Sequence, residues 1–253
     1  MGRIIAVVNQ KGGVGKTTTA VNLTAALTEQ GKKVLLCDFD PQANATSGLG
    51  INKRKLKHSV YDVLINECSP QEAVVSTKYG DVLPATADLA GAAVELLSVP
   101  EPNKQLKNAL QQLQNNYDLI LIDCPPSLEM LTINGLAAAD GILVPVQCEY
   151  YALEGLTDLM NTLRIVKKGI NPALEIFGVA LTMFDGRTNF STQVAQEVRR
   201  HFPGKVYASV IPRNVRLAEA PSHGLPVIAY DKHSRGAEAY RQMAQEIIKK
   251  IGR

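Results

Sequence analysis

The chain has 253 residues, of which 45% are hydrophobic and 20% charged, and its formal net charge is +3. This balance is typical of a globular protein with a sizeable core and excludes a disordered or fibrous chain. No apolar run approaches the roughly 18 residues of a membrane span, and the short apolar run after Arg3 predicts no signal peptide. The four scattered cysteines indicate buried, reduced thiols in a cytoplasmic protein.

The charge is unevenly distributed along the chain. Residues 1–163 carry a net charge of −5, whereas residues 164–253 carry +8. A basic last third favours a polyanionic partner such as nucleic acid or a membrane surface, although a solvated charged surface would explain the same excess.

Short β-branched apolar runs alternate with longer helical patterns, which predicts βαβ units and a mostly parallel, twisted sheet. The runs are nearly continuous in apolar residues, so we expect helices on both faces of the sheet and one α/β domain over residues 1–253. Residues 41–100 are less regular. The expected strands are 3–8, 33–37, 118–122, 141–146, 175–182 and 205–210, and the expected helices are 16–29, 101–116, 127–138, 150–168, 188–201 and 234–250.

The first strand runs into the glycine-rich segment Lys11-Gly12-Gly13-Val14-Gly15-Lys16-Thr17-Thr18. Glycines let the backbone fold around an anion with its N–H groups pointing inward, and the next helix offers its positive N-terminus to phosphate. Lys16 can reach the β- and γ-phosphate oxygens, and the Thr17 hydroxyl can ligate Mg²⁺. The segment therefore predicts the P-loop of a nucleoside triphosphatase. It departs from the generic pattern, because Gln10 stands where the first glycine is expected.

Three carboxylates follow predicted strands. Asp38 and Asp40 come after the second strand, and alternation predicts that they point to the same side, at the strand ends where such sheets bind ligands. They could orient an attacking water and hold Mg²⁺ through water. Asp123 follows four apolar residues, as in a Walker B strand, and would accept a hydrogen bond from a water on Mg²⁺ or from Thr17. No general base is obvious, so we expect slow hydrolysis, which suits a switch. Ser127 is expected to cap the next helix.

The form of the loop, with Lys11 ahead of the glycines, resembles the deviant Walker A loop of the ParA/MinD class. Asp38–Gln42 resembles the DxDPQ signature of the same class. Together with these motifs, further segments make the chain similar to ParA/Soj chromosome-partitioning ATPases over residues 2–246. Within that family it resembles the short Soj type, because the chain begins directly at the first strand. These segments are 44–50, 84–86, 131–134, 145–155, 211–224 and 234–238.

The resemblance implies an ATP- and Mg²⁺-dependent sandwich dimer. In that class the extra lysine, here Lys11, reaches the nucleotide of the other subunit, and Gly12 would lie where the two loops face each other. Asp40 would serve hydrolysis, with a supporting role for Asp38. The adenine-side contacts of the class match Pro212 and Asn214.

The resemblance also implies non-specific binding to nucleoid DNA and stimulation of hydrolysis by a ParB/Spo0J partner. Arg187 and Arg216 would be the arginines of the DNA face, although a surface salt bridge is the alternative for any one of them. The weaker candidates are Arg199, Arg200, Lys249 and Lys250.

Two other functions stay open. A MinD-like, membrane-bound division regulator would need a basic amphipathic helix with bulky apolar anchors, and the C-terminal residues 247–253 fit that poorly, so we expect no stable membrane binding. An ATP-dependent ligase or amidotransferase on the same fold would need a substrate pocket that the sequence does not reveal.

Overall fold

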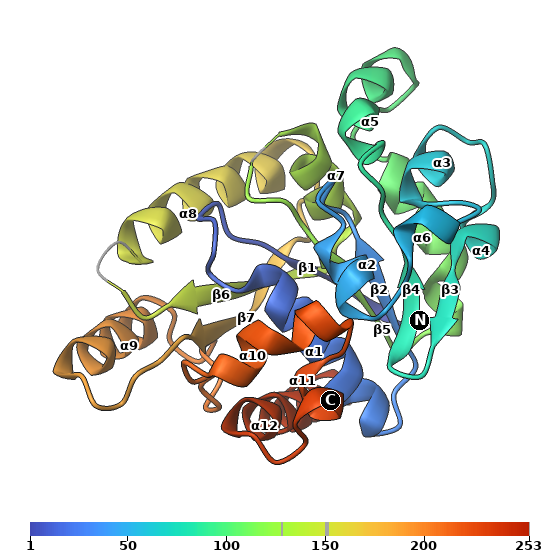
Figure 1. The fold of residues 1–253 in the computed structure, drawn as a ribbon. Helices are drawn as coiled ribbons and strands as arrows, with labels where there is room; N and C mark the ends of the chain where they lie inside the picture. The colour runs from blue at the N-terminus through green and yellow to red at the C-terminus, as the bar shows by residue number, and fades with distance from the viewer. Residues whose placement is uncertain (128, 150–151, 253) are drawn as a thin grey trace.

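The structure, a computed structural model, describes residues 1–127, 129–149 and 152–252, without the side chains of residues 152–155 and 157. Tyr150 and Tyr151 of the 145–155 motif therefore lie outside the described residues. A seven-stranded sheet with the order β3-β4-β2-β5-β1-β6-β7 runs through the molecule, and only β3 is antiparallel to its neighbour (Figure 1). The strands are β1 (Arg3–Val7), β2 (Val34–Asp38), β3 (Val75–Thr77), β4 (Gly80–Leu83), β5 (Leu119–Asp123), β6 (Gly141–Gln147) and β7 (Glu175–Thr182).

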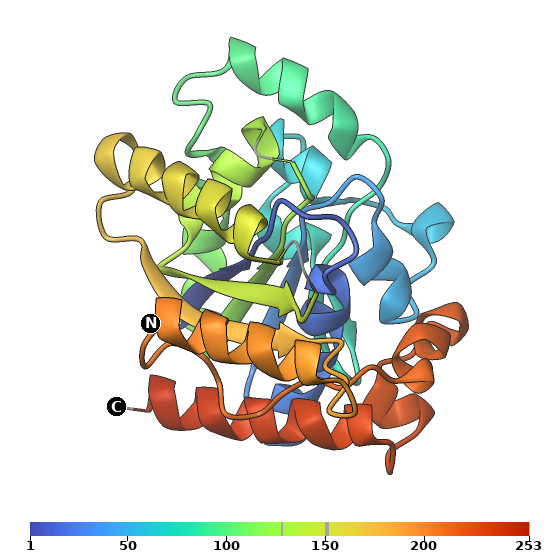
Figure 2. The same ribbon diagram turned by 90° about the vertical axis from the view of Figure 1, so that its left-hand side faces the viewer.

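Helices cover both faces of the sheet, because alternate residues of each buried strand point to opposite sides. Ile4 and Ala6 pack with α3, α5, α6, α7, α8 and α9, whereas Ile5 and Val7 pack with α1, α2, α10, α11 and α12 (Figures 1 and 2). The predicted α/β fold is confirmed. The helices are α1 (Lys16–Glu29), α2 (Asn44–Gly48), α3 (Val60–Leu64), α4 (Pro70–Ala73), α5 (Leu89–Glu95), α6 (Gln105–Leu113), α7 (Met130–Ala138), α8 (Ala152–Gly169), α9 (Asn189–His201), α10 (Val215–Glu219), α11 (Val227–Tyr230) and α12 (Arg235–Ile251).

The register of the central strands brings three strand ends to one level. In β1, Val7 lies opposite Asp123 of β5, and on the other side of β5 Asp38 of β2 also lies opposite Asp123. The loop that follows β1 and the carboxylates that end β2 and β5 therefore meet at one edge of the sheet, where parallel sheets bind ligands.

The prediction of a strand over residues 205–210 is wrong. The segment touches β7 through a single bridge between Val206 and Val179. Beyond it, the backbone N–H groups of Ala208 and Ser209 donate to the Glu246 carboxylate of α12, each at 2.8 Å. These two donors are therefore not bonded to β7. One side chain of α12 thus competes with the sheet edge for these donors.

Other boundaries also differ from the predictions. The hairpin of β3 and β4 lies in the region predicted to be irregular, because its strands are only three and four residues long and carry polar residues. The helix expected from 127 begins at Met130 with Glu129 at its N-cap, and Ser127 instead accepts a hydrogen bond from the Thr132 hydroxyl through its carbonyl. The helix expected over 101–116 is α6 followed by a 3-10 turn at Gln114–Asn116.

Candidate nucleotide-binding site

The glycine-rich loop has the open shape that a phosphate group needs. Gly13 and Gly15 have positive φ angles of 75° and 90°, which glycine adopts without strain. A Cβ added at Gly12 or Gly13 would meet no atom within 4 Å, so the space beside the loop is free. Gly15 also precedes the first turn of α1, which has no side-chain cap, and the first N–H groups of the helix therefore point toward this space.

Neighbouring strands hold the loop in place. The Thr182 hydroxyl at the end of β7 donates to the carbonyl of Val14 at 2.8 Å. Asn9 accepts from the Lys11 N–H at 3.0 Å and donates to the carbonyl of Pro145 at 2.8 Å. These bonds fix the loop to β6 and β7 before any ligand binds, which lowers the entropic cost of binding.

Lys16 lies under the loop with its ammonium group inside. Its side chain is 6% exposed, and Nζ donates to the carbonyl of Lys11 at 3.2 Å. Burial lowers the pKa of Lys16, while Asp123 and Asp40 act in the opposite direction. The lysine is thus a buried cation that, among the described residues, donates only to a neutral carbonyl, and a phosphate would be a far stronger partner.

The carboxylate of Asp123 is fully buried, and neither oxygen has a hydrogen bond of normal geometry within the described residues. Burial and the nearby Asp38 raise its pKa well above the usual range, and the neighbouring Thr17 side chain and Lys16 lower it. A buried carboxylate without a partner is costly to keep. It fits a hydrated divalent cation, which would supply the missing charge and donors.

Asp38 and Asp40 differ in their surroundings. Asp38 is fully buried, and one of its oxygens accepts from the Thr46 N–H at 2.7 Å and from the Thr46 hydroxyl at 2.6 Å. Burial raises the pKa of Asp38 to about 6, and the bonds from Thr46 oppose this. Asp40 is partly exposed and accepts from the Gln42 N–H at 2.9 Å. Asp40 is therefore the more accessible of the two to a ligand, whereas Asp38 anchors the turn.

A cavity of about 350 Å³ adjoins the loop on the side of α10. Its walls include Gly15 and Thr18 of the loop together with Pro212 and Asn214, the two residues expected on the adenine side. The Asn214 side chain also accepts from the Arg216 N–H at 2.8 Å and so caps α10. The remaining walls are mostly apolar, as a planar base requires.

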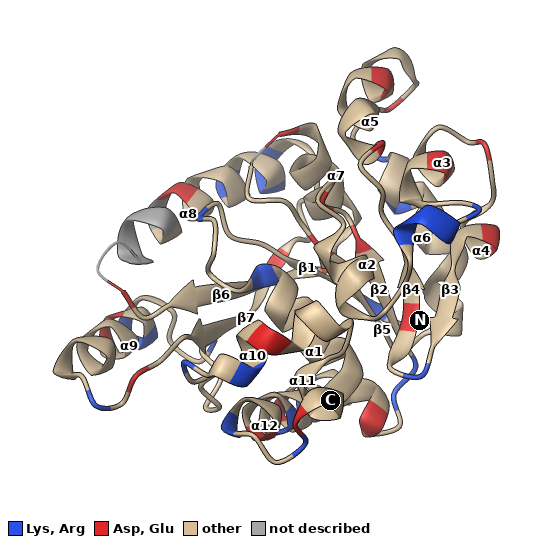
Figure 3. Cartoon of the chain, viewed as in Figure 1, with Lys and Arg blue, Asp and Glu red and all other residues tan. Residues whose placement is uncertain are grey.

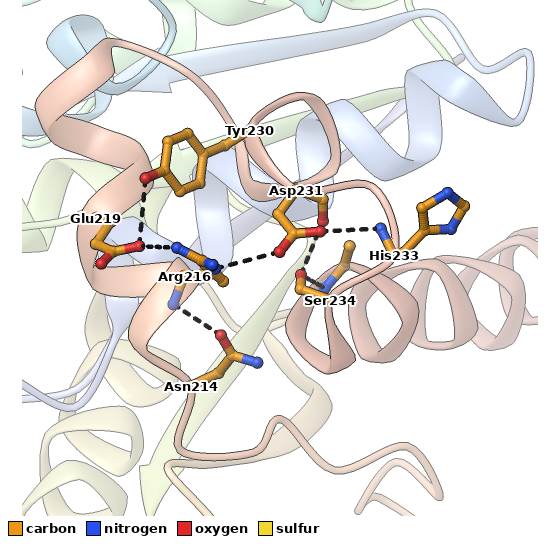
Figure 4. Close-up of polar contacts among 8 residues, drawn as sticks. Asn214, Arg216, Glu219, Tyr230, Asp231, His233 and Ser234 are labelled. Carbon is orange, nitrogen blue, oxygen red and sulfur yellow. Dashed lines mark hydrogen bonds and ion pairs between the residues drawn. The ribbon is translucent and has the colours of Figure 1, made fainter.

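The four arginines expected to contact DNA are exposed, but three of them form salt bridges with carboxylates. Arg187 forms two bonds to the Asp185 carboxylate, at 2.9 and 2.7 Å. Arg216 binds Glu219 and a second carboxylate, as Figure 4 shows. Arg200 pairs with Glu197 on α9, and Arg199 is exposed beside it. Both basic and acidic residues occur on α9, α10 and α12 (Figure 3).

The two C-terminal lysines differ. Lys249 is exposed, whereas the ammonium of Lys250 lies 4.7 Å from the centre of the Phe177 ring and donates to the carbonyl of Phe177. Lys250 therefore stabilises the contact of α12 with β7 and is no free cation for DNA. A groove of about 1000 Å³ beside α10 is lined by Arg187 together with Arg213 and Arg235, both exposed.

Several supporting residues escape prediction from the sequence. Thr46, Thr182 and Asn9 hold Asp38 and the loop, yet each is a common polar residue. The partners of Asn9 and Thr182 lie 136 and 168 positions away, and Thr46 lies eight positions from Asp38. Tyr240 of α12 lines the cavity and shares a hydrogen bond of 3.2 Å with the Thr19 hydroxyl. Only Asn9 carries a local signal, because an Asn just before a glycine-rich turn commonly bonds the backbone two residues on.

Comparison with known sequences places these features in a family. A family model described as an AAA domain matches residues 2–176. The chain is 57% identical, over 98% of both chains, to the sporulation initiation inhibitor protein Soj of Bacillus subtilis (strain 168). It is 51% identical to the chromosome partitioning protein ParA of Myxococcus xanthus (strain DK1622), over 99% of this chain and 89% of that protein.

Solved structures share the fold, and one of the two described next contains nucleotide. Cobyrinic acid a,c-diamide synthase from Mycobacterium smegmatis, with bound ADP and magnesium, has a TM-score of 0.87 and 41% identity over 100% of this chain and 97% of that one. The cell division ATPase MinD of Pyrococcus furiosus has a TM-score of 0.81 and 31% identity over 98% and 99% of the two chains. In this chain, such a ligand would bind beside the open loop, in contact with buried Lys16 and close to the Asp123 carboxylate.

Proposed function

Because this chain belongs to the Soj/ParA family of chromosome-partitioning ATPases, we propose that it is a switch that dimerises on ATP, binds DNA without sequence preference and hydrolyses ATP slowly. One observation supports nucleotide binding above the others: at the edge of the sheet where β1, β2 and β5 end, Lys16 and Asp123 are both buried. Neither forms a salt bridge among the described residues. Each is costly alone, and MgATP would neutralise both.

The residues of the loop then have separate tasks. The N–H groups of Gly12–Lys16 surround the phosphates, and Lys16 places its charge on the β- and γ-phosphate oxygens. Thr17 and Asp123 would hold the metal, Thr17 directly and Asp123 through water. Mg²⁺ supplies charge neutralisation between the phosphates when it is bound. The apolar cavity beside Pro212 and Asn214 would take the base.

Hydrolysis is expected to be slow, because no general base is obvious in the sequence. Asp40 is the accessible carboxylate at this edge, so we assign to it the orientation of the attacking water. Asp38 supports it through the short turn between them, where the Asp40 N–H lies 3.4 Å from Asp38 Oδ1.

Dimerisation would complete the site. Lys11 is only partly buried and makes no salt bridge in the described part of the chain, so its ammonium is available to a nucleotide bound in a second copy. Such a lysine would stabilise the charge that develops on the phosphates, as an arginine finger does. We propose that a ParB/Spo0J-type partner accelerates this step and that the protein works at the nucleoid.

A membrane role is less well supported. Among the described residues no helix is both long and apolar enough to cross a membrane. The apolar face of α12, with Tyr240, Met243 and Ile247, is buried against α1 and the sheet, so it is unavailable to lipid. A ligase function on the same fold remains the second alternative, and it predicts fast ATP turnover that depends on a small carboxylic acid.

DNA retention with ATP, with ADP and without nucleotide tests the proposal, with the mass of the dimer recorded in parallel. We expect retention only with ATP, no sequence preference, and weakening with salt. Arg187→Glu or Arg216→Glu should abolish retention while the dimer still forms, because each places a repulsive charge twice on one face. Retention by an intact Arg216→Glu dimer with an unchanged salt dependence would contradict this DNA face.

A further inference from the structure

Arg216 is held by two carboxylates from different parts of the chain. Its Nη1 lies 2.8 Å from Oε2 of Glu219, one turn further along α10, and its Nε lies 3.2 Å from Oδ2 of Asp231, in the turn between α11 and α12 (Figure 4). The Tyr230 hydroxyl donates to the same Glu219 oxygen at 3.2 Å. We call Arg216, Glu219 and Asp231 the arginine clamp.

The arginine clamp changes the charge that DNA meets. One guanidinium and two carboxylates give a net charge of −1, so a phosphate that approaches Arg216 meets two like charges within salt-bridge distance of it. A phosphate can take the place of these carboxylates only if they move away. By contrast, Arg213 and Arg235 on the neighbouring groove have no salt bridge in the described part of the chain.

The helix that carries Arg216 also borders the nucleotide cavity. Leu217 and Ala218 of α10 line that cavity, and Asn214, which caps α10, lines it as well. Asp231 lies outside α10 and is bound to the start of α12, where its carbonyl accepts from the Ser234 hydroxyl at 2.9 Å. A shift of α10 when the cavity is filled would therefore change the distance between Arg216 and Asp231.

We propose that the arginine clamp is an autoinhibitory contact, in which Glu219 and Asp231 withhold Arg216 from DNA phosphate until α10 moves. The proposal rests on the proposed DNA-binding function and adds its regulation. Glu219 and Asp231 are thus expected to oppose DNA binding, although both lie beside a residue expected to contact DNA. Exposed ion pairs are individually weak, so a shift of α10 suffices to open the clamp.

The test compares the DNA affinity of the wild type with that of the double variant Glu219→Gln, Asp231→Asn, without nucleotide and with ATP, at several low salt concentrations. Without nucleotide, where α10 has not moved, we expect the double variant to bind about threefold to tenfold more tightly, and its log–log salt slope to steepen by about 1 per chain for the freed Arg216. With ATP the gain should be smaller, because the wild-type clamp is then open. Glu238→Gln is the control, because it removes a carboxylate from the neighbouring groove that bonds Gln242 rather than an arginine.

Two further measurements separate the explanations. In an Arg216→Ala background, the double variant should no longer raise the DNA affinity. The clamp is overturned if the affinity still rises in that background, or if Glu238→Gln raises it by the same amount, because loss of negative charge alone then explains the effect. Thermal melting and ATP-dependent dimer mass verify that each variant is folded. If the wild-type dimer retains no DNA with ATP at low salt, the proposed function fails. The clamp alone is refuted if the wild type binds DNA with ATP but, without nucleotide, the double variant binds no more tightly than the wild type.

Discussion

At the residue scale, the candidate site is defined by groups that are buried without an adequate partner. Lys16 and Asp123 are almost completely buried, and within the described residues neither is in a salt bridge. Their charges lower the stability of the ligand-free protein, and a ligand that neutralises them recovers that free energy on binding. Such strained groups are characteristic of functional sites.

Lys16→Ala should lose ATP binding by at least about a hundredfold, because the phosphates lose a charge-assisted partner that is shielded from water. Titration of a fluorescent ATP analogue measures the affinity. Lys11→Ala is the control: it removes the other lysine of the loop, which is only partly buried and which we assign to the nucleotide of a second copy, and it should leave the affinity of a single subunit nearly unchanged. Equal affinity of Lys16→Ala and the wild type would remove the loop from the nucleotide site.

The buried Asp38 predicts a pH effect on stability without ligand. Burial raises its pKa to about 6, whereas an unfolded Asp titrates near pH 4. Between these values the folded state binds more protons, so the free energy of unfolding falls as pH rises through this window, by about 2 kcal/mol.

Asp38→Asn should remove that slope, since the amide oxygen can still accept both bonds from Thr46. Urea unfolding at pH 4, 5, 6 and 7 measures it. Asp185→Asn is the comparison, because Arg187 lowers the pKa of Asp185 to about 2 and its effect belongs below pH 4. A slope unchanged by Asp38→Asn would mean that Asp38 is ionised throughout the window.

At the scale of elements, the loop between β1 and α1 is rigid where it meets the sheet and open where it faces outward. Thr182 and Asn9 fix its inner side, whereas Gly12 and Gly13 are exposed. The φ angle of Gly13 is 75°, but that of Gly12 is not positive. Any restriction on a side chain at Gly12 must therefore come from outside this chain.

Gly12→Val should fold and bind ATP as the wild type does, because no atom of the other described residues, apart from the two chain neighbours, lies within 4 Å of the added Cβ. It should stay monomeric with ATP, since the side chain would meet the facing loop of a second copy. Light scattering with ATP measures the mass. Gly13→Val is the contrast, because its positive φ strains any side chain and should weaken ATP binding in the monomer. An ATP-dependent Gly12→Val dimer would contradict the facing-loop arrangement.

At the scale of the whole molecule, slow hydrolysis is expected to set the lifetime of the proposed DNA-bound dimer. Asp40→Ala should bind ATP and dimerise yet hydrolyse it at least about a hundredfold more slowly, which leaves a trapped dimer on DNA. Phosphate release and dimer mass over time are the two measurements. Asp62→Ala serves as a control carboxylate remote from the loop, at the capping box of α3. Wild-type turnover in Asp40→Ala would exclude Asp40 from the reaction.

The amino-acid sequence by itself determined the five long parallel strands and the phosphate loop, because both are local: apolar runs mark buried strands, and the loop needs only its own glycines, lysine and threonine. Only the tertiary structure decided that β5 lies between β1 and β2, and hence that Asp123 stands opposite Asp38. It also decided that the N–H groups of Ala208 and Ser209 bond Glu246 and not β7, and that Arg216 is bound by Asp231 as well as by its neighbour Glu219. Except for the pair within α10, these contacts join separate elements, and the order in which strands pair and helices pack cannot be derived from local pattern.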